Sequence, residues 1–134
     1  MNSVGIDTNI LLRLIVDDDE RQREAVVRFG AKLNKELRGL ITLVSLLETD
    51  WALRRRYGYT RRESIGAIRR LTGIRGVEVE RHDVVVRAMH LVDLKNVDFA
   101  DALLAGCAIE AGCDRVFTLD KKAAEAIPAM ELLP

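Results

Sequence analysis

Residues 97–109 have the sequence VDFADALLAGCAI. The stretch is apolar on nearly every side, which is typical of a helix buried inside a fold. Its first turn nevertheless carries Asp98 and Asp101, which are three residues apart and therefore share one face. The simplest interpretation is a helix start, with Asp98 as the N-cap and Asp101 as the acid at N3, both favoured by the helix dipole. A role in binding or catalysis would require other acidic residues to lie close to Asp98 and Asp101 in the folded chain.

The length of 134 residues predicts a single domain, residues 1–134, with one core. Acidic and basic residues are equal in number, which argues against a coat protein that binds nucleic acid by charge alone. No apolar run is long enough to cross a bilayer and no export signal is visible, so we expect a cytoplasmic protein with no membrane partner. Cys107 and Cys113 lack zinc-site spacing and are interpreted as reduced thiols.

Apolar runs and turn residues predict alternating strands and helices along the whole chain. The predicted strands cover residues 3–6, 39–42, 77–79, 115–119 and 130–133. The predicted helices cover residues 10–15, 20–36, 43–57, 60–71, 82–92 and 98–111, with a short one from 122. This alternation predicts an α/β protein, a three-layer α/β/α sandwich with a central, mainly parallel sheet of four or five strands.

Two aspartates follow directly after predicted strands. Asp7 comes after the first strand and Asp120 after the fourth. Ligands of an open parallel sheet bind beyond the carboxyl ends of its strands, and the helix that starts at Asp98 is expected to open at the same edge. Each residue also has a purely structural interpretation, since Asp7 can start a helix and Asp120 can form an Asx-turn.

Glu48 has no basic residue at the neighbouring positions of its predicted helix. The residues on its face are apolar, namely Val44, Trp51 and Ala52. A carboxylate directed at an apolar interior is costly unless a cation meets it, so we expect Glu48 to face one. The alternative is that Glu48 faces solvent. Asp50, by contrast, has Arg54 four residues on, the usual spacing of an exposed ion pair.

Four or five carboxylates in one pocket repel one another unless a cation neutralises them. A hard divalent ion with oxygen ligands fits best, so the predicted cofactor is Mg²⁺, with Mn²⁺ as the other choice. Magnesium keeps several waters and commonly binds phosphate oxygens. The acids therefore predict phosphoryl chemistry, in which the metal activates a water.

Four motifs, in order along the chain, resemble those of PIN-domain ribonucleases, and most of all the VapC toxins of bacterial toxin–antitoxin pairs. They are Asp7-Thr8-Asn9, Ser45-Leu46-Leu47-Glu48, the run from Asp98 to Ala105, and Thr118-Leu119-Asp120. The resemblance covers residues 4–120. It implies that Asp7, Glu48, Asp101 and Asp120 are the catalytic metal ligands, with Asp98 as an additional acid. Thr8 and Thr118 match small polar positions that support the carboxylates or water.

The resemblance also implies an activity and partners. We expect a metal-dependent endoribonuclease that leaves a 5′-phosphate and a 3′-hydroxyl, a homodimer, and a cognate VapB-type antitoxin. No histidine is needed as a base, and His82 and His90 are interpreted as solvated or core-edge residues.

Nine arginines and no lysines lie between residues 54 and 81, with only three acids. Such a bias is typical of a surface that guides a nucleic-acid backbone, although any single arginine is more simply a solvated residue. The residues expected to contact RNA are Arg54, Arg55, Arg56, Arg61 and Arg62.

Other functions remain open at this point. The same acids fit a metal-dependent DNA or flap-type nuclease. A receiver-like phosphoacceptor also combines a parallel sheet, acids and Mg²⁺, but it resembles this chain less. A catalytically silent binding module, with the acids serving only as helix caps, is the third alternative.

Overall fold

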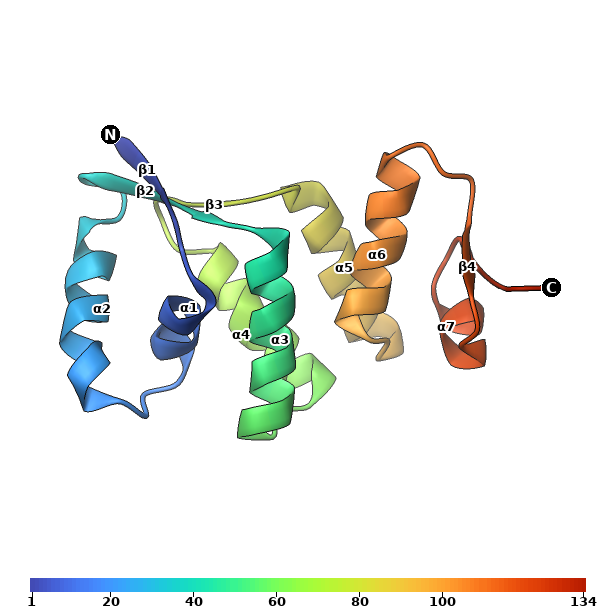
Figure 1. Ribbon diagram of the computed structural model, residues 1–134, viewed down its shortest axis with the longest axis horizontal. Helices are drawn as coiled ribbons and strands as arrows, with labels where there is room; N and C mark the ends of the chain where they lie inside the picture. The colour runs from blue at the N-terminus through green and yellow to red at the C-terminus, as the bar shows by residue number, and fades with distance from the viewer.

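The structure, a computed structural model, describes all residues 1–134 and consists of seven helices and five strands (Figure 1). The strands are β1 (Asn2–Gly5), β2 (Leu37–Ile41), β3 (Val77–Val79), β4 (Val116–Thr118) and β5 (Met130–Leu132). The helices are α1 (Thr8–Ile15), α2 (Glu20–Lys32), α3 (Leu43–Tyr57), α4 (Arg61–Thr72), α5 (His82–Lys95), α6 (Phe99–Glu110) and α7 (Lys121–Ala126). The order and type of all elements agree with the sequence prediction.

All strand pairs are parallel, which confirms the α/β class, but the strands form two sheets. One has the order β1-β2-β3, and the other consists of β4 and β5. The predicted single sheet of four or five strands is therefore wrong for this chain. Alternation of strands and helices predicts parallel pairing, but it does not determine which strand edges meet. Figure 1 shows the three-stranded sheet at one end of the molecule and β4 at the other, with α5 and α6 between them.

The helix ends follow local sequence signals. Gly58 ends α3 in the left-handed conformation, at φ +70°, as expected for a C-terminal glycine. Helix α4 begins with a complete capping box. Thr60 Oγ1 accepts a hydrogen bond from the Glu63 N–H, and Glu63 Oε1 accepts one from the Thr60 N–H. The predicted start at Thr60 is therefore confirmed.

We expect Thr60→Ala to lower the free energy of unfolding by about 1 kcal/mol, because it leaves a helix N–H without its acceptor. The hydrogen bond from the Thr60 backbone lowers the pKa of Glu63. The ionised Glu63 carboxylate thus adds to the free energy of unfolding at neutral pH, and this stabilisation is lost as the pH falls through the lowered pKa. Urea denaturation checks the prediction. Thr72→Ala, at the other end of α4, is the control and should change the stability by less than about 0.5 kcal/mol.

A single large core joins the two ends of the molecule. It runs from Ile6 and Leu46, beside the three-stranded sheet, through Phe99 on α6 to Ile127 and to Met130, the first residue of β5. Helices α5 and α6 pack closely against each other in the middle of this core. The C-terminal elements therefore join the rest of the chain through Ala123, Ile127 and Met130, which share this core.

Helix α6 is only partly buried, contrary to the sequence prediction. Phe99, Ala102 and Leu103 lie in the core, but Leu104 is 54% exposed and Ile109 is 43% exposed. The apolar sequence predicts that other elements bury this helix on all sides, but within this chain no element buries Leu104 and Ile109.

No helix has both the length and the apolar character needed to cross a membrane.

Candidate functional site

One group of predicted site residues lies at the carboxyl end of β1. Asp7 is exposed and immediately precedes α1, and its carboxylate makes no capping hydrogen bond. Thr8 and Asn9 are the first two residues of this helix, which therefore begins two residues earlier than predicted. Thr8 Oγ1 donates a hydrogen bond of 3.1 Å to Glu48 Oε1 on α3. Asp7, Thr8 and Glu48 line one cleft of about 570 Å³ together with Trp51.

Glu48 is exposed to solvent rather than directed into the core, so the burial predicted for it is wrong. Its neighbours Val44 and Trp51 are themselves 65% and 51% exposed. The apolar character of a helix face thus did not mean that the face was covered. The buried acid of α3 is Asp50, which is 2% exposed.

A second group of acids lies at the N-termini of α6 and α7. Asp98 Oδ1 accepts a hydrogen bond from the Asp101 N–H at 3.2 Å, which confirms Asp98 as the N-cap of α6. Asp120 Oδ1 caps α7 by accepting from the Ala123 N–H at 3.1 Å. The Asp120 N–H donates to Thr118 Oγ1, also at 3.1 Å, so Thr118 fixes the turn that carries this acid.

The charges of this second group repel one another. Burial raises the pKa of Asp101, and the negative charges of Asp98 and Asp120 raise it further, while Arg61 lowers it. Asp101 is therefore a carboxylate whose ionised form is disfavoured by its burial and by two nearby acids. A bound cation would remove that cost.

We expect Asp101→Asn to raise the melting temperature of the metal-free protein near neutral pH. Because the folded pKa of Asp101 lies above its unfolded value, the ionised carboxylate costs stability at high pH. This cost disappears as the pH falls below the ordinary carboxyl pKa of 3.8, so the two melting curves should converge there. Thermal melts in a chelator across this pH range test the expectation, with the exposed Asp114→Asn as the control. A variant that is less stable than wild type at neutral pH would contradict it.

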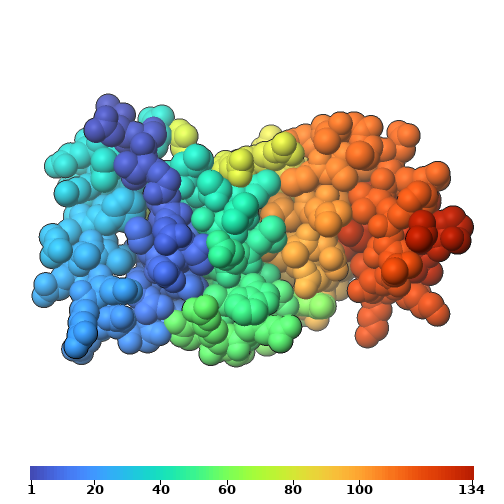
Figure 2. Space-filling view, in the orientation of Figure 1, coloured from blue at the N-terminus to red at the C-terminus, as the bar shows by residue number.

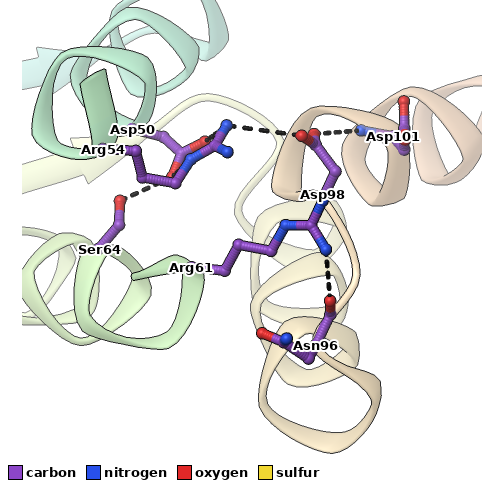
Figure 3. A network of polar contacts seen from close by, with 7 residues as sticks. All are labelled: Asp50, Arg54, Arg61, Ser64, Asn96, Asp98 and Asp101. Atoms are coloured by element: carbon purple, nitrogen blue, oxygen red, sulfur yellow. Dashed lines mark hydrogen bonds and ion pairs between the residues drawn. The ribbon is translucent and has the colours of Figure 1, made fainter. Parts of the chain in front are cut away.

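Arg54 connects α3 to the second group (Figure 3). Its guanidinium binds the buried Asp50 through two hydrogen bonds and reaches Asp98 Oδ2 at 3.5 Å. Asp50 also accepts a hydrogen bond of 2.6 Å from Ser64 Oγ on α4. The predicted Asp50–Arg54 pair is therefore present, but it is buried rather than exposed. Arg61 donates to the Asn96 carbonyl at 2.8 Å, just before α6.

The remaining arginines predicted to bind RNA are more accessible. Arg55, Arg56 and Arg62 are exposed and have no ion-pair partner. Arg56 lines the cleft of Asp7 and Glu48, and Arg55 lies over the Trp51 ring at 5.9 Å from its centroid. The sequence interpretation missed Trp51 as a cleft residue, although its position three residues after Glu48 places it on the same helix face.

The predicted acids thus stand in two groups, on opposite sides of α3. Asp7 and Glu48 face the cleft beside α1, while Asp98, Asp101 and Asp120 lie on the α6 side. Within the single chain, no three acidic, histidine or cysteine side chains are arranged to hold a metal ion. The single pocket expected from the sequence is therefore not formed by one chain. His82 and His90 are exposed and belong to neither group.

Proteins with an open α/β sheet bind their ligands beyond the carboxyl ends of the strands. In this chain Asp7 and Asp120 follow such strand ends, so the fold and the acids place the chain in this class. The family model described as the PIN domain matches residues 4–127, and the chain belongs to this family. No curated protein matches the sequence.

Solved structures similar to the chain include three toxin proteins or complexes. VapC20 of Mycobacterium tuberculosis, described as a toxin that cleaves the sarcin–ricin loop, is 22% identical, with a TM-score of 0.42 over 92% of this chain and 95% of that one. VapBC2 of Rickettsia felis, bound to a promoter DNA fragment, is 16% identical, with a TM-score of 0.41 over 99% and 98%. A toxin–antitoxin complex from Klebsiella pneumoniae is 16% identical, with a TM-score of 0.35 over 96% and 95%.

Proposed function

We propose that the chain is a divalent-metal-dependent endoribonuclease and the toxin of a VapBC-type toxin–antitoxin pair. The observation that carries the proposal is the placement of Asp98, Asp101 and Asp120 at the N-termini of α6 and α7, where burial and the charges of the other two acids raise the pKa of Asp101. Membership of the PIN domain family supports it, because the matched region contains every predicted acid.

The donor set fits a hard cation. The predicted ligands are carboxylates alone, with no histidine or cysteine among them, and such oxygen donors suit Mg²⁺ or Mn²⁺. Asp7, Glu48, Asp101 and Asp120 would hold the ion, with Asp98 beside them. When bound, it would supply polarisation of a phosphate oxygen and a lowered pKa for a water molecule.

The other residues of the site would position these acids. The Thr8 hydroxyl holds one oxygen of Glu48, so the second oxygen stays free in the cleft. Asp98 fixes the first turn of α6 and therefore the direction of Asp101. Thr118 plays the same part for Asp120. Glu48, Asp101 and Asp120 thus each have a neighbouring polar group that limits their motion, which reduces the cost of binding an ion.

Incubation of the full chain with end-labelled RNA tests the proposal. We expect cleavage with Mg²⁺ or Mn²⁺, none with a chelator, and products with a 5′-phosphate. Single-stranded and flap DNA substrates in the same assay separate the alternative nuclease from the proposed one. If no nucleic acid is cut and calorimetry detects no Mg²⁺ or Mn²⁺ binding, the proposal fails and a silent binding module becomes the better interpretation.

A toxin should arrest growth when it is expressed in the cytoplasm of a bacterial host. We expect the wild-type chain to do so and co-expression of a cognate VapB-type antitoxin to relieve the arrest. Colony counts after induction measure both effects. Equal growth of cells with the wild type and with an empty vector would contradict the toxin assignment.

Arg55→Glu combined with Arg56→Glu should weaken RNA binding, and the loss should be greater at low salt than at high salt. The reason is that each arginine that contacts a phosphate releases counterions when RNA binds. Fluorescence anisotropy over a series of salt concentrations measures the effect.

Arg70→Glu with Arg75→Glu is the matched control, because it changes the net charge equally. These residues lie at the end of α4 and before β3, at the opposite edge of the sheet from Asp7. We expect this control to leave binding nearly unchanged. Equal losses for the two double variants would show that the arginines act only through overall charge.

A further inference from the structure

Strand β1 has an unpaired edge. It pairs with β2 on one side only, from Asn2 to Gly5, and nothing pairs with its other side. Three of its four residues are exposed. Strands of parallel sheets are normally buried on both faces, so a parallel edge strand that faces water is an incomplete structure.

The sheet of β4 and β5 is incomplete in the same way. It has only two strands of three residues each, paired in parallel, and two-stranded sheets are marginal on their own. Large apolar side chains around it face water: Phe117 is 48% exposed, Leu119 82% and Leu132 43%. Strand β4 has β5 on one side and no partner on the other.

The acids show which two edges belong together. Asp7 lies two residues beyond the last residue of β1, and Asp120 lies two residues beyond the last residue of β4. If β1 and β4 pair in parallel with these ends aligned, Val4 lies beside Phe117 and the two aspartates meet at one edge of a five-stranded sheet. Asp98 and Asp101 accompany Asp120, because these three acids already lie close together.

The two edges do not meet within one chain. Figures 1 and 2 show residues of the N-terminal strands at one end of the elongated molecule and the C-terminal residues at the other. Polar contacts across the middle hold α5 and the start of α6 in place against α3 and α4: Arg54 binds Asp98, and Arg69 binds Asp93 on α5. To bring β4 to its own β1, the chain would have to pull Ala123, Ile127 and Met130 out of the core that they share with α5 and α6.

We infer that a second copy of this chain completes the sheet and the site. Strand β4 of each copy, with β5 on its other side, pairs with β1 of the other copy, so that one copy supplies Asp7 and Glu48 and its partner supplies Asp98, Asp101 and Asp120. The exchange is reciprocal, so it forms a closed two-fold dimer rather than a fibre. The formal net charge of the chain is zero, so repulsion between two copies does not oppose this association. The part of this inference that concerns the metal site rests on the proposed function, whereas the strand exchange does not.

Cross-linking between single-cysteine chains tests the strand pairing without any assay of activity. In a background with Cys107→Ser and Cys113→Ser, one tagged chain carries Val4→Cys and a differently tagged chain carries Phe117→Cys. We expect a short bis-maleimide to join the two tags in high yield after co-expression. Val27→Cys, on the exposed face of α2, replaces Val4→Cys in the control and should give little product.

Two outcomes would overturn the exchange. One is the absence of a product between the tags. The other is a monomer in which Val4→Cys and Phe117→Cys on the same chain cross-link to each other, which would mean that β4 returns to its own β1. Light scattering of the uncross-linked wild type distinguishes the monomer from the dimer directly.

Complementation of two defective variants tests the divided site. In an exchanged dimer, Asp7→Asn in one copy and Asp120→Asn in the other put both changes into one site and leave the second site intact. Random co-assembly should then restore about a quarter of the wild-type Mn²⁺ sites, since half of the dimers are mixed and each has one good site. Calorimetry with Mn²⁺ measures this number.

Asp7→Asn mixed with Glu48→Gln is the matched control, because both residues come from the same copy and every site stays damaged. We expect no recovery from this pair. When the wild type binds Mn²⁺, recovery from both pairs, or from neither, contradicts the exchange. The failures are distinguishable: cross-linked dimers that bind no metal refute the proposed function alone, whereas a monomer that binds metal refutes the exchange alone.

Discussion

Asp7→Asn should lower metal-dependent RNA cleavage by about 10²–10³-fold while leaving the fold intact. Ligation to a metal is worth several kcal/mol in the transition state, and each 1.4 kcal/mol is about tenfold in rate. The substitution removes one negative charge and keeps the shape of the side chain. The carboxylate of Asp7 caps no helix, so its loss removes no capping hydrogen bond from α1.

The measurement is the single-turnover rate of cleavage of an end-labelled RNA at saturating metal. Asp114→Asn removes an exposed acid just before β4 and should cleave at the wild-type rate. Asp120→Asn should be as defective as Asp7→Asn, although Asn can still cap α7. If Asp7→Asn cleaves RNA within about threefold of the wild type, then its carboxylate is not a ligand of the reactive ion.

Local features of the fold were predictable because they depend on neighbours in the sequence. Thr60 and Glu63 form a capping box from residues three apart, and Gly58 ends a helix by its own freedom at positive φ. The start of α6 at Asp98 follows from the same logic. Such signals need no knowledge of the tertiary structure.

Burial on α3 was not predictable in the same way. Glu48 and Asp50 are two residues apart, and the sequence placed the first inside and the second outside, whereas the structure has the reverse. Which of the two acids is buried depends on Ser64 and Arg54, because both donate hydrogen bonds to the buried Asp50. Ser64 is fourteen residues away, so no helical pattern within α3 could reveal it.

The meeting of the acids also depends on long-range pairing. Asp7 and Asp120 each follow a strand, as predicted, but the common edge requires β1 and β4 to be neighbours. Strand order is set by which edges find each other, either in one chain or in two, and alternation does not specify it. The positions of these acids after strands and at helix starts could therefore be predicted from the sequence, whereas their grouping could not.

The buried acid of α3 leads to the largest expected effect on stability. Asp50→Ala should lower the free energy of unfolding by about 3 kcal/mol, because it leaves the charge of Arg54 partly buried without its main partner. Asp50 is 2% exposed and accepts hydrogen bonds from Arg54 and from Ser64 Oγ. The substitution thus removes a charge pair and leaves a buried hydroxyl unsatisfied.

Urea denaturation at one fixed protein concentration measures the loss, since a dimer gains apparent stability with concentration. Ser64→Ala, which removes one hydrogen bond and no charge, should cost only about 1 kcal/mol. Adding Arg54→Leu to Asp50→Ala should recover part of the stability, because the unpaired guanidinium is then gone. A loss for Asp50→Ala no larger than that for Ser64→Ala would mean that Arg54 finds a full replacement in Asp98, the acid that it already contacts at 3.5 Å.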